Sequence, residues 1–199
     1  MGRRLVLAVA VLVSGAFLLS SAAVAQQALV IKALTEKKVS QLPARPLFWR
    51  VENFPTLAQA QAAAGQYGLA AESGKKAWLF TLGPAGGSSA GGTRVIEIGP
   101  LPMLVASDYV LRVNEATGPS GSITSVHTHP GSEAFYVLAG EQCIRTPQRM
   151  IRVVVGRAET GPGADTPLQV SNCGSTDLQA LVLFVVDATR PFSSPASFP

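Results

Sequence analysis

The chain has 199 residues, of which 47% are hydrophobic and 14% are charged, with 16 Lys and Arg against 12 Asp and Glu. A formal net charge of +4 is too small for a nucleic acid or an anionic membrane surface to be the expected partner. The length is sufficient for one domain with a full hydrophobic core.

Residues 1–25 have the three parts of a secretory signal peptide. Arg3 and Arg4 supply the positive start, residues 5–19 form an apolar run, and Ala23-Val24-Ala25 is a small-residue cleavage site. The alternative, a retained anchor, needs about 20 apolar residues to span a bilayer. We expect cleavage after Ala25 and export to the bacterial periplasm or the extracellular medium, with no stable membrane insertion afterwards.

Residues 26–92 are predicted to be an N-terminal extension. Its apolar runs are residues 28–34 (strand or helix), 47–51 (strand), and 68–72 with 77–82 (a hairpin). A short helix is expected after Pro55, because Thr56 is a good N-cap and Gln59 completes a capping box. Gly65 is the predicted C-terminal stop of this helix.

From residue 93 the apolar residues alternate and turn residues recur at short intervals. The expected strands are 93–98, 108–114, 122–127, 133–138, 141–145, 150–155 and 181–186. This rhythm is typical of an all-β sandwich or barrel of antiparallel strands. We expect a β-barrel domain over residues 93–188, followed by a Pro/Ser-rich tail, 189–199, that is an extended strap or is disordered.

The two cysteines, Cys143 and Cys173, permit two interpretations. An even number in an exported protein favours a disulfide, which would close a loop of about 30 residues. The alternative is two separate buried thiols, which pack as small hydrophobic groups.

The only two histidines, His127 and His129, lie two residues apart, and Glu133 follows four residues later. On a strand, residues i and i+2 point to the same face, and the turn at Pro130-Gly131 can return Glu133 to the same place. Two imidazoles and a carboxylate suit one divalent transition metal, namely iron, manganese, zinc or nickel. The alternative is that both histidines are simply exposed.

These residues resemble the first motif of the cupin superfamily, G-x5-H-x-H-x3-E-x6-G. The matching positions are Gly121, His127, His129, Glu133 and Gly140. The resemblance covers roughly residues 93–187. It implies an all-β fold, a cupin-type antiparallel β-barrel (jelly-roll-like), here with one short N-terminal helix. It also implies that the three polar side chains point into the barrel and bind the metal.

The resemblance implies a second motif, G-x5-P-x-G-x2-H-x3-N, which this chain matches only in part. Gly156, Pro162 and Asn172 fit, but the histidine position falls on Leu168, which cannot bind a metal. The site then has three ligands with open positions, or Gln169 or Asp165 substitutes, or the metal is absent. The spacing from Pro162 to Asn172 is one residue longer than the motif, and Gln169 would normally face the other way unless this extra residue forms a bulge.

Two further residues are candidates for the substrate pocket, Arg112 and Tyr136. On the strand 108–114, Arg112 shares a face with Val110 and Asn114, and it would meet an anionic ligand if that face is the interior. Either Phe135 or Tyr136 must face inward as an apolar wall.

Three functions are compatible with these features. The first is a metal-dependent enzyme, a dioxygenase or isomerase, that acts on a small oxygenated organic molecule. The second is a non-catalytic cupin that binds or senses a small ligand in the periplasm. The third is a structural barrel in which the motif is a relic. The expected partners are a small-molecule ligand and, as an option, a second copy of the chain in a homodimer.

Overall fold

The computed structural model describes residues 27–199, and the predicted signal peptide, residues 1–25, lies outside this range. Within residues 27–199 no helix is both long enough and apolar enough to cross a bilayer.

The described chain consists almost entirely of β-strands, with one short helix, α1 (Leu57–Ala63). The strands are β1 (Val30–Val39), β2 (Phe48–Phe54), β3 (Gly68–Ser73), β4 (Lys76–Gly83), β5 (Thr93–Ile98), β6 (Tyr109–Gly118), β7 (His127–Thr128), β8 (Gly131–Ala139), β9 (Glu141–Arg145), β10 (Met150–Val154), β11 (Ala158–Thr160), β12 (Gln169–Asn172), β13 (Leu178–Asp187) and β14 (Ser194–Pro195). The prediction of an all-β fold with one short helix is confirmed.

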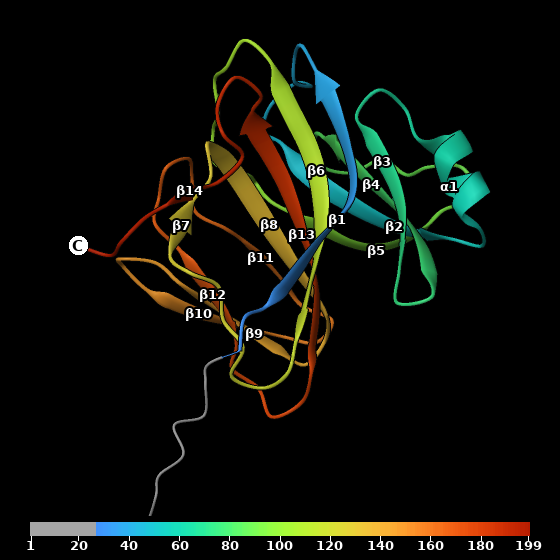
Figure 1. Ribbon diagram of the computed structural model, residues 1–199. Helices are drawn as coiled ribbons and strands as arrows, with labels where there is room; N and C mark the ends of the chain where they lie inside the picture. The colour runs from blue at the N-terminus through green and yellow to red at the C-terminus, as the bar shows by residue number, and fades with distance from the viewer. Residues whose placement is uncertain (1–26) are drawn as a thin grey trace, which may run out of the picture.

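The strands form a central sheet with a smaller sheet on each side (Figure 1). The central sheet has the order β1-β6-β13-β8-β11, and every pairing in it is antiparallel. One neighbour is the four-stranded sheet β3-β4-β2-β5, and the other is the three-stranded sheet β10-β9-β12, with β14-β7 beside it. On the pocket side the central sheet and the three-stranded sheet face each other, as in a jelly roll.

Alternation along β6, β8 and β13 divides the central sheet into two faces. The core face packs on the four-stranded sheet and carries Leu111, Val113, Ala134, Tyr136, Leu181, Leu183 and Val185. The pocket face packs on the three-stranded sheet and carries Ala116, Phe135, Val137, Val182 and Phe184, with Asn114 and Glu133 among them. The core face meets three large buried rings of the four-stranded sheet, Trp49, Trp78 and Phe80.

The strand pairing does not follow the domain boundary expected at residue 93. β1, from the predicted extension, pairs with β6 along its whole length, although a register shift interrupts the ladder between Ala33 and Thr35. β5, from the predicted barrel, pairs instead with β2 in the four-stranded sheet. Backbone groups at a sheet edge accept any strand of suitable register, so sequence periodicity could not indicate which sheet each strand would join.

The local signals around α1 and the β3–β4 hairpin are largely reproduced. The Gln59 backbone N–H donates to Thr56 Oγ1 at 3.2 Å, as predicted for the N-cap. The helix ends earlier than predicted, with Ala64 as an extended C-cap in place of Gly65. In the hairpin, Gly74 and Lys75 both have positive φ, as a two-residue type I′ turn requires.

The region after residue 120 departs most from the predicted strands. Of the expected strand 122–127, only His127 lies in a strand, β7, which also includes Thr128. β11 and β12 were not predicted, because each is too short to show a hydrophobic period. The tail is a strap, because β14 pairs with β7.

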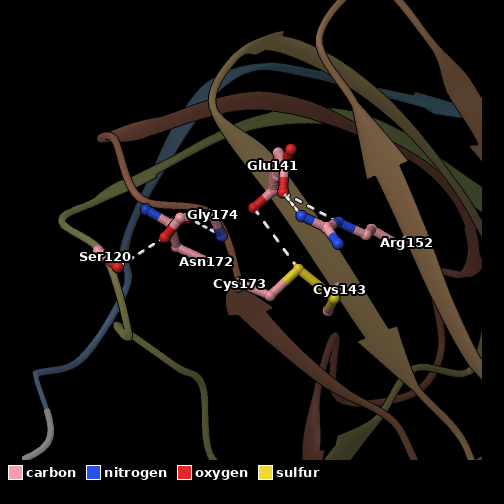
Figure 2. Close-up of a disulfide and its surroundings, with 7 residues drawn as sticks. All are labelled: Ser120, Glu141, Cys143, Arg152, Asn172, Cys173 and Gly174. Atoms are coloured by element: carbon pink, nitrogen blue, oxygen red, sulfur yellow. Dashed lines mark hydrogen bonds and ion pairs between the residues drawn. A yellow bond between two sulfur atoms is a disulfide. The ribbon is translucent and has the colours of Figure 1, made fainter.

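Cys143 and Cys173 form a disulfide with a Cα–Cα distance of 5.7 Å (Figure 2). Cys143 lies on β9, and Cys173 directly follows β12, so the bridge joins neighbouring strands of the three-stranded sheet. Figure 2 also shows Arg152 of β10 facing Glu141 of β9, with Arg152 Nε donating to Glu141 Oε2 at 2.9 Å. Covalent and ionic links therefore hold all three strands of this sheet together.

Candidate functional site

A cavity of about 250 Å³ lies between the pocket face and the wall that carries β7, β12 and the C-terminal strap. Its apolar surface comes mainly from Ile31, Phe135, Val170, Val182, Phe184 and Phe192. Its polar residues are Asn114, Thr124, Ser125, His127, His129, Glu133 and Ser193. The structure thus brings the predicted residues His127, His129 and Glu133 to one cavity.

Both imidazoles are held by hydrogen bonds from Nδ1 to a backbone carbonyl. His127 Nδ1 lies 2.8 Å from Ser125 O, and His129 Nδ1 lies 2.6 Å from Phe192 O. A carbonyl only accepts, so each Nδ1 carries the hydrogen, and each Nε2 of the neutral ring keeps a free lone pair. This is the tautomer in which a histidine binds a metal through Nε2.

The surroundings of His129 favour its neutral form. Burial lowers the pKa of His129 from 6.5 to about 4 and outweighs the opposing hydrogen bond to Phe192 O. Electrostatic interactions with His127 and Arg112 lower this pKa further. The ring of His129 also packs at 4.8 Å from the rings of Phe184 and Phe192, so its environment is aromatic as well as dry.

Glu133 is buried on β8 without a partner. Its exposed fraction is 3%, and within residues 27–199 its carboxyl group takes part in no hydrogen bond or ion pair with another side chain or with the backbone. Burial raises the pKa of Glu133 from 4.5 to about 8. A carboxyl group in this state gains from any cation or donor that enters the cavity.

The donor set fits a transition metal in its chemistry. Two imidazoles with free Nε2 atoms and one carboxyl group are ligands that zinc, iron, manganese and nickel accept. Within the described part of the chain, however, no three His, Cys, Asp or Glu side chains are gathered closely enough to hold an ion. The His127 and His129 ring centroids are 5.0 Å apart. Binding therefore requires these side chains to turn toward a common point.

The candidates for a fourth ligand do not join the site. Leu168 pairs with His127 through two backbone hydrogen bonds of 2.9 and 3.0 Å, and its side chain is 1% exposed within the apolar core. Gln169 does not line the cavity, and its Nε2 donates to Thr124 O at 3.1 Å. Asp165 lies in a turn with positive φ and forms an ion pair with Arg190 at the surface. Strand alternation explains the outcome for Gln169, because no bulge turns it inward.

Of the two predicted pocket residues, Arg112 lies at the rim and Tyr136 lies elsewhere. Arg112 is on the same side of β6 as Asn114, and its guanidinium stacks 4.3 Å from the Phe192 ring. It is half-buried and already paired with Glu36, so it is not the isolated buried cation considered above. Tyr136 belongs to the core face, where its ring meets Trp78, and Phe135 forms the cavity wall.

The sequence reasoning missed the contributions of Asn114 and Phe192. Asn114 had been placed beside Arg112 by alternation, but nothing local indicated that this face was the interior. Phe192 belongs to the tail, and its ring lines the cavity while its carbonyl orients His129. The strap is held near it by β14 and by a bond from Ala196 N to Val126 O of 3.1 Å.

The sheet order and the placement of the motif on β7 and β8 correspond to a cupin-type fold. No family model matches the chain, and no curated protein matches it. Among solved structures, it is similar to a cupin superfamily protein from Desulfitobacterium hafniense DCB-2. That match has 17% identity and a TM-score of 0.35 and covers 39% of this chain and 68% of the other.

Two further solved structures are similar over part of the chain. A cupin-like protein from Thermotoga maritima has 13% identity and a TM-score of 0.40, with 44% of this chain and 65% of that one covered. DMSP lyase DddQ from Ruegeria pomeroyi DSS-3 has 22% identity and a TM-score of 0.38, with 43% of each chain covered. The chain therefore spans less than two thirds of these two proteins.

Proposed function

We propose that the protein is an exported cupin-type protein that binds one divalent transition metal through His127, His129 and Glu133, with a small oxygenated organic molecule as its ligand or substrate. The observation that carries the proposal is that the potential metal-binding atoms of all three side chains have no other partner. Two imidazoles present free Nε2 lone pairs to a cavity in which a buried carboxyl group has no other partner. A purely structural set of polar residues would be satisfied by its own neighbours.

The residues of the chain would hold and orient the site. Ser125 O and Phe192 O keep both imidazoles in the ligand tautomer, and Glu133 supplies negative charge from the central sheet. A bound metal would supply Lewis acidity or an open position for a small oxygenated molecule, as in a dioxygenase or isomerase.

Export belongs to the same proposal. The disulfide between Cys143 and Cys173 is suited to an oxidising compartment such as the periplasm or the extracellular medium. It therefore agrees with the signal peptide predicted in residues 1–25.

The alternative is a non-catalytic protein that binds a small ligand. Among the described residues that line the cavity, no acid or base accompanies the three proposed ligands. Leu168 also occupies the position of the usual fourth ligand. A site without a separate proton-transfer group binds a molecule more readily than it transforms one.

Metal content tests the proposal directly. Protein purified from the periplasm is expected to contain about one equivalent of transition metal, or to take it up from Fe²⁺, Mn²⁺, Zn²⁺ or Ni²⁺ before dialysis. The double variant His127→Ala, His129→Ala should lose it, and Glu133→Gln should bind it more weakly. Gln169→Leu is the matched control and should keep the full content, because Gln169 lies outside the cavity.

Two results would contradict the proposal. The first is wild-type protein that stays free of metal after all four reconstitutions. The second is equal metal content in the wild type and the double variant. With metal loaded, O2 consumption or product formation from small diketones or phenols supports the enzyme, whereas a shift in melting temperature without turnover supports the binding protein.

A further inference from the structure

We propose that Asn114 is a ligand-selecting residue and that the cavity takes a small, largely apolar carboxylate whose carboxylate group is bound by Asn114. The inference rests on the proposed function only in using the same cavity. Asn114 would be a second polar anchor in the cavity, on a different strand from the three proposed metal ligands. The ligand would lie between Asn114 and those three residues.

Asn114 is a buried amide with an unused donor. Its exposed fraction is 2%, it lines the cavity, and its Oδ1 accepts from Arg112 Nε at 2.8 Å. Within residues 27–199 its Nδ2 has no acceptor on the protein. This nitrogen is not sealed in the protein, because the fully buried side-chain nitrogens without a partner among the described residues are those of Trp49 and Gln142, so a ligand in the cavity can reach it.

Arg112 determines which atom of the amide faces the cavity. A guanidinium only donates, so the Asn114 atom that it contacts must be the oxygen, and the NH2 group is then directed elsewhere. Arg112 is itself held by stacking on Phe192 and by the pair with Glu36. The Asn114 donor is therefore oriented before any ligand arrives, which reduces the entropy cost of binding.

The side-chain amides of two other buried residues, Asn172 and Gln142, differ from that of Asn114. Asn172 is saturated, because Nδ2 donates to Gly118 O and Thr176 O, while Oδ1 accepts from Gly174 N. Gln142 has no partner for either amide atom, but it does not line this cavity. Asn114 alone of these three combines an unused donor with a position on the cavity.

The distance between the anchors limits the ligand. Asn114 on β6 pairs with Val182 of β13, and Glu133 on β8 pairs with Phe184, so two strand spacings and a stagger of two residues separate their backbones by about 12 Å. Val182 and Phe184 cover the intervening β13, and the cavity of about 250 Å³ is below the range for drug-sized molecules. A molecule with a short apolar body and one polar group at the Asn114 end matches this space.

The charge at the rim favours an anion over a neutral carbonyl at the Asn114 end. Arg112 is adjacent to Asn114, and its counterion Glu36 is mostly exposed, so water screens that pair. The only carboxyl group of the described residues on the cavity wall is that of Glu133, at the other anchor. A carboxylate at Asn114 therefore gains the amide hydrogen bond and the attraction of Arg112.

Calorimetry with benzoate and 4-methylpentanoate tests the inference, with benzyl alcohol as the neutral analogue. Wild-type protein should bind both carboxylates and prefer benzoate over benzyl alcohol. Asn114→Leu should weaken benzoate binding by about ten- to hundredfold, the usual value of a hydrogen bond to a charged group. Asn114→Asp should weaken it further by repulsion. Ser193→Ala, at another polar residue of the cavity, is the matched control and should bind as wild type does.

Metal content measured on the same samples separates this inference from the metal proposal. Asn114→Leu should keep its metal while losing benzoate binding. The double histidine variant should lose its metal while keeping benzoate binding. Arg112→Gln is a second variant, in case Asn114→Leu fails to fold, and should also weaken benzoate binding. Wild-type protein that binds neither carboxylate, or Asn114→Leu that binds benzoate as tightly as wild type, would overturn the inference.

Discussion

The four-stranded sheet and the cavity each bury one glutamate, and the two carboxyl groups have opposite surroundings. Glu52 has no exposed surface, but it accepts hydrogen bonds from Ser89 N at 2.8 Å, from Ser89 Oγ at 2.7 Å and from Arg50 Nε at 3.0 Å. Glu133 is almost as buried and has no partner among the described residues. Burial is therefore shared by both sites, and hydrogen-bond saturation is what distinguishes them.

The pKa values follow from this difference. Burial alone would raise the pKa of Glu52, but the hydrogen bonds from Ser89 and the pair with Arg50 outweigh it, and the net pKa is lowered. Glu133 has only the effect of burial, and its pKa rises to about 8. Of these two glutamates, the protein itself satisfies the one in the four-stranded sheet and leaves the one at the cavity available to a ligand.

The same division runs through the central sheet. Its core face packs against Trp49, Trp78 and Phe80, whereas part of its pocket face borders a cavity and is not packed against other side chains. The small sheet that closes the cavity is cross-linked by the disulfide (Figure 2). We infer that the bridge compensates on the pocket side for the core that the cavity replaces.

Removal of the disulfide should have the largest effect on stability. The variant Cys143→Ser, Cys173→Ser frees a loop with a sequence separation of 30. We expect the free energy of unfolding in urea to fall by about 3–4 kcal/mol in the chain-entropy model. Hydrogen exchange should increase more on β9 and β12 than on β2 and β4. Equal increases in both sheets would show that the bridge does not act on the pocket side in particular.

Matched valine truncations on the two faces should have unequal effects. Val113→Ala opens a void in the packed core face and should cost about 2–3 kcal/mol. Val182→Ala only enlarges the existing cavity and should cost about 1 kcal/mol less than that. Urea unfolding with unchanged m-values measures both. Equal losses would mean that the two faces are packed alike.

Glu52→Gln should have a slightly smaller effect, which depends on pH. Loss of the charged acceptor should cost about 2 kcal/mol at pH 7, since Arg50 and Ser89 lose a carboxylate partner. Because the folded-state pKa of Glu52 is lowered from 4.5, the wild type has this stability above pH 4.5 and loses it as the pH falls through the folded-state pKa.

Unfolding curves at pH 7 and at about pH 3 measure this dependence, because the difference between wild type and Glu52→Gln should shrink at the lower pH. Glu97→Gln is the control, since Glu97 also accepts a hydrogen bond from the loop between β4 and β5 that contains Ser89, at Gly86 N, but is partly exposed. If Glu97→Gln lowers the free energy of unfolding as much as Glu52→Gln does, the hydrogen bond to the loop, rather than the buried charge, provides the stability.

Short-range physics made several features of this protein predictable from its sequence. Thr56 and the turn at Gly74 and Lys75 depend on local backbone geometry, and strand alternation depends on a period of two residues. The i, i+2 spacing of His127 and His129 and the turn before Glu133 likewise brought three polar side chains to one cavity. The all-β class and the cupin resemblance depended on the same local information.

The tertiary structure alone decided what surrounds those residues. The side of β6 that faces inward depends on where β13 and the two outer sheets pack, so Asn114 and Phe135 could not be placed in advance. The tautomer of His129 depends on a carbonyl 63 residues away, in a tail without periodicity. Leu168 faces the core because it pairs with His127 in one particular register, through an isolated antiparallel bridge. These are contacts between distant segments, and sequence periodicity carries no information about which segments meet.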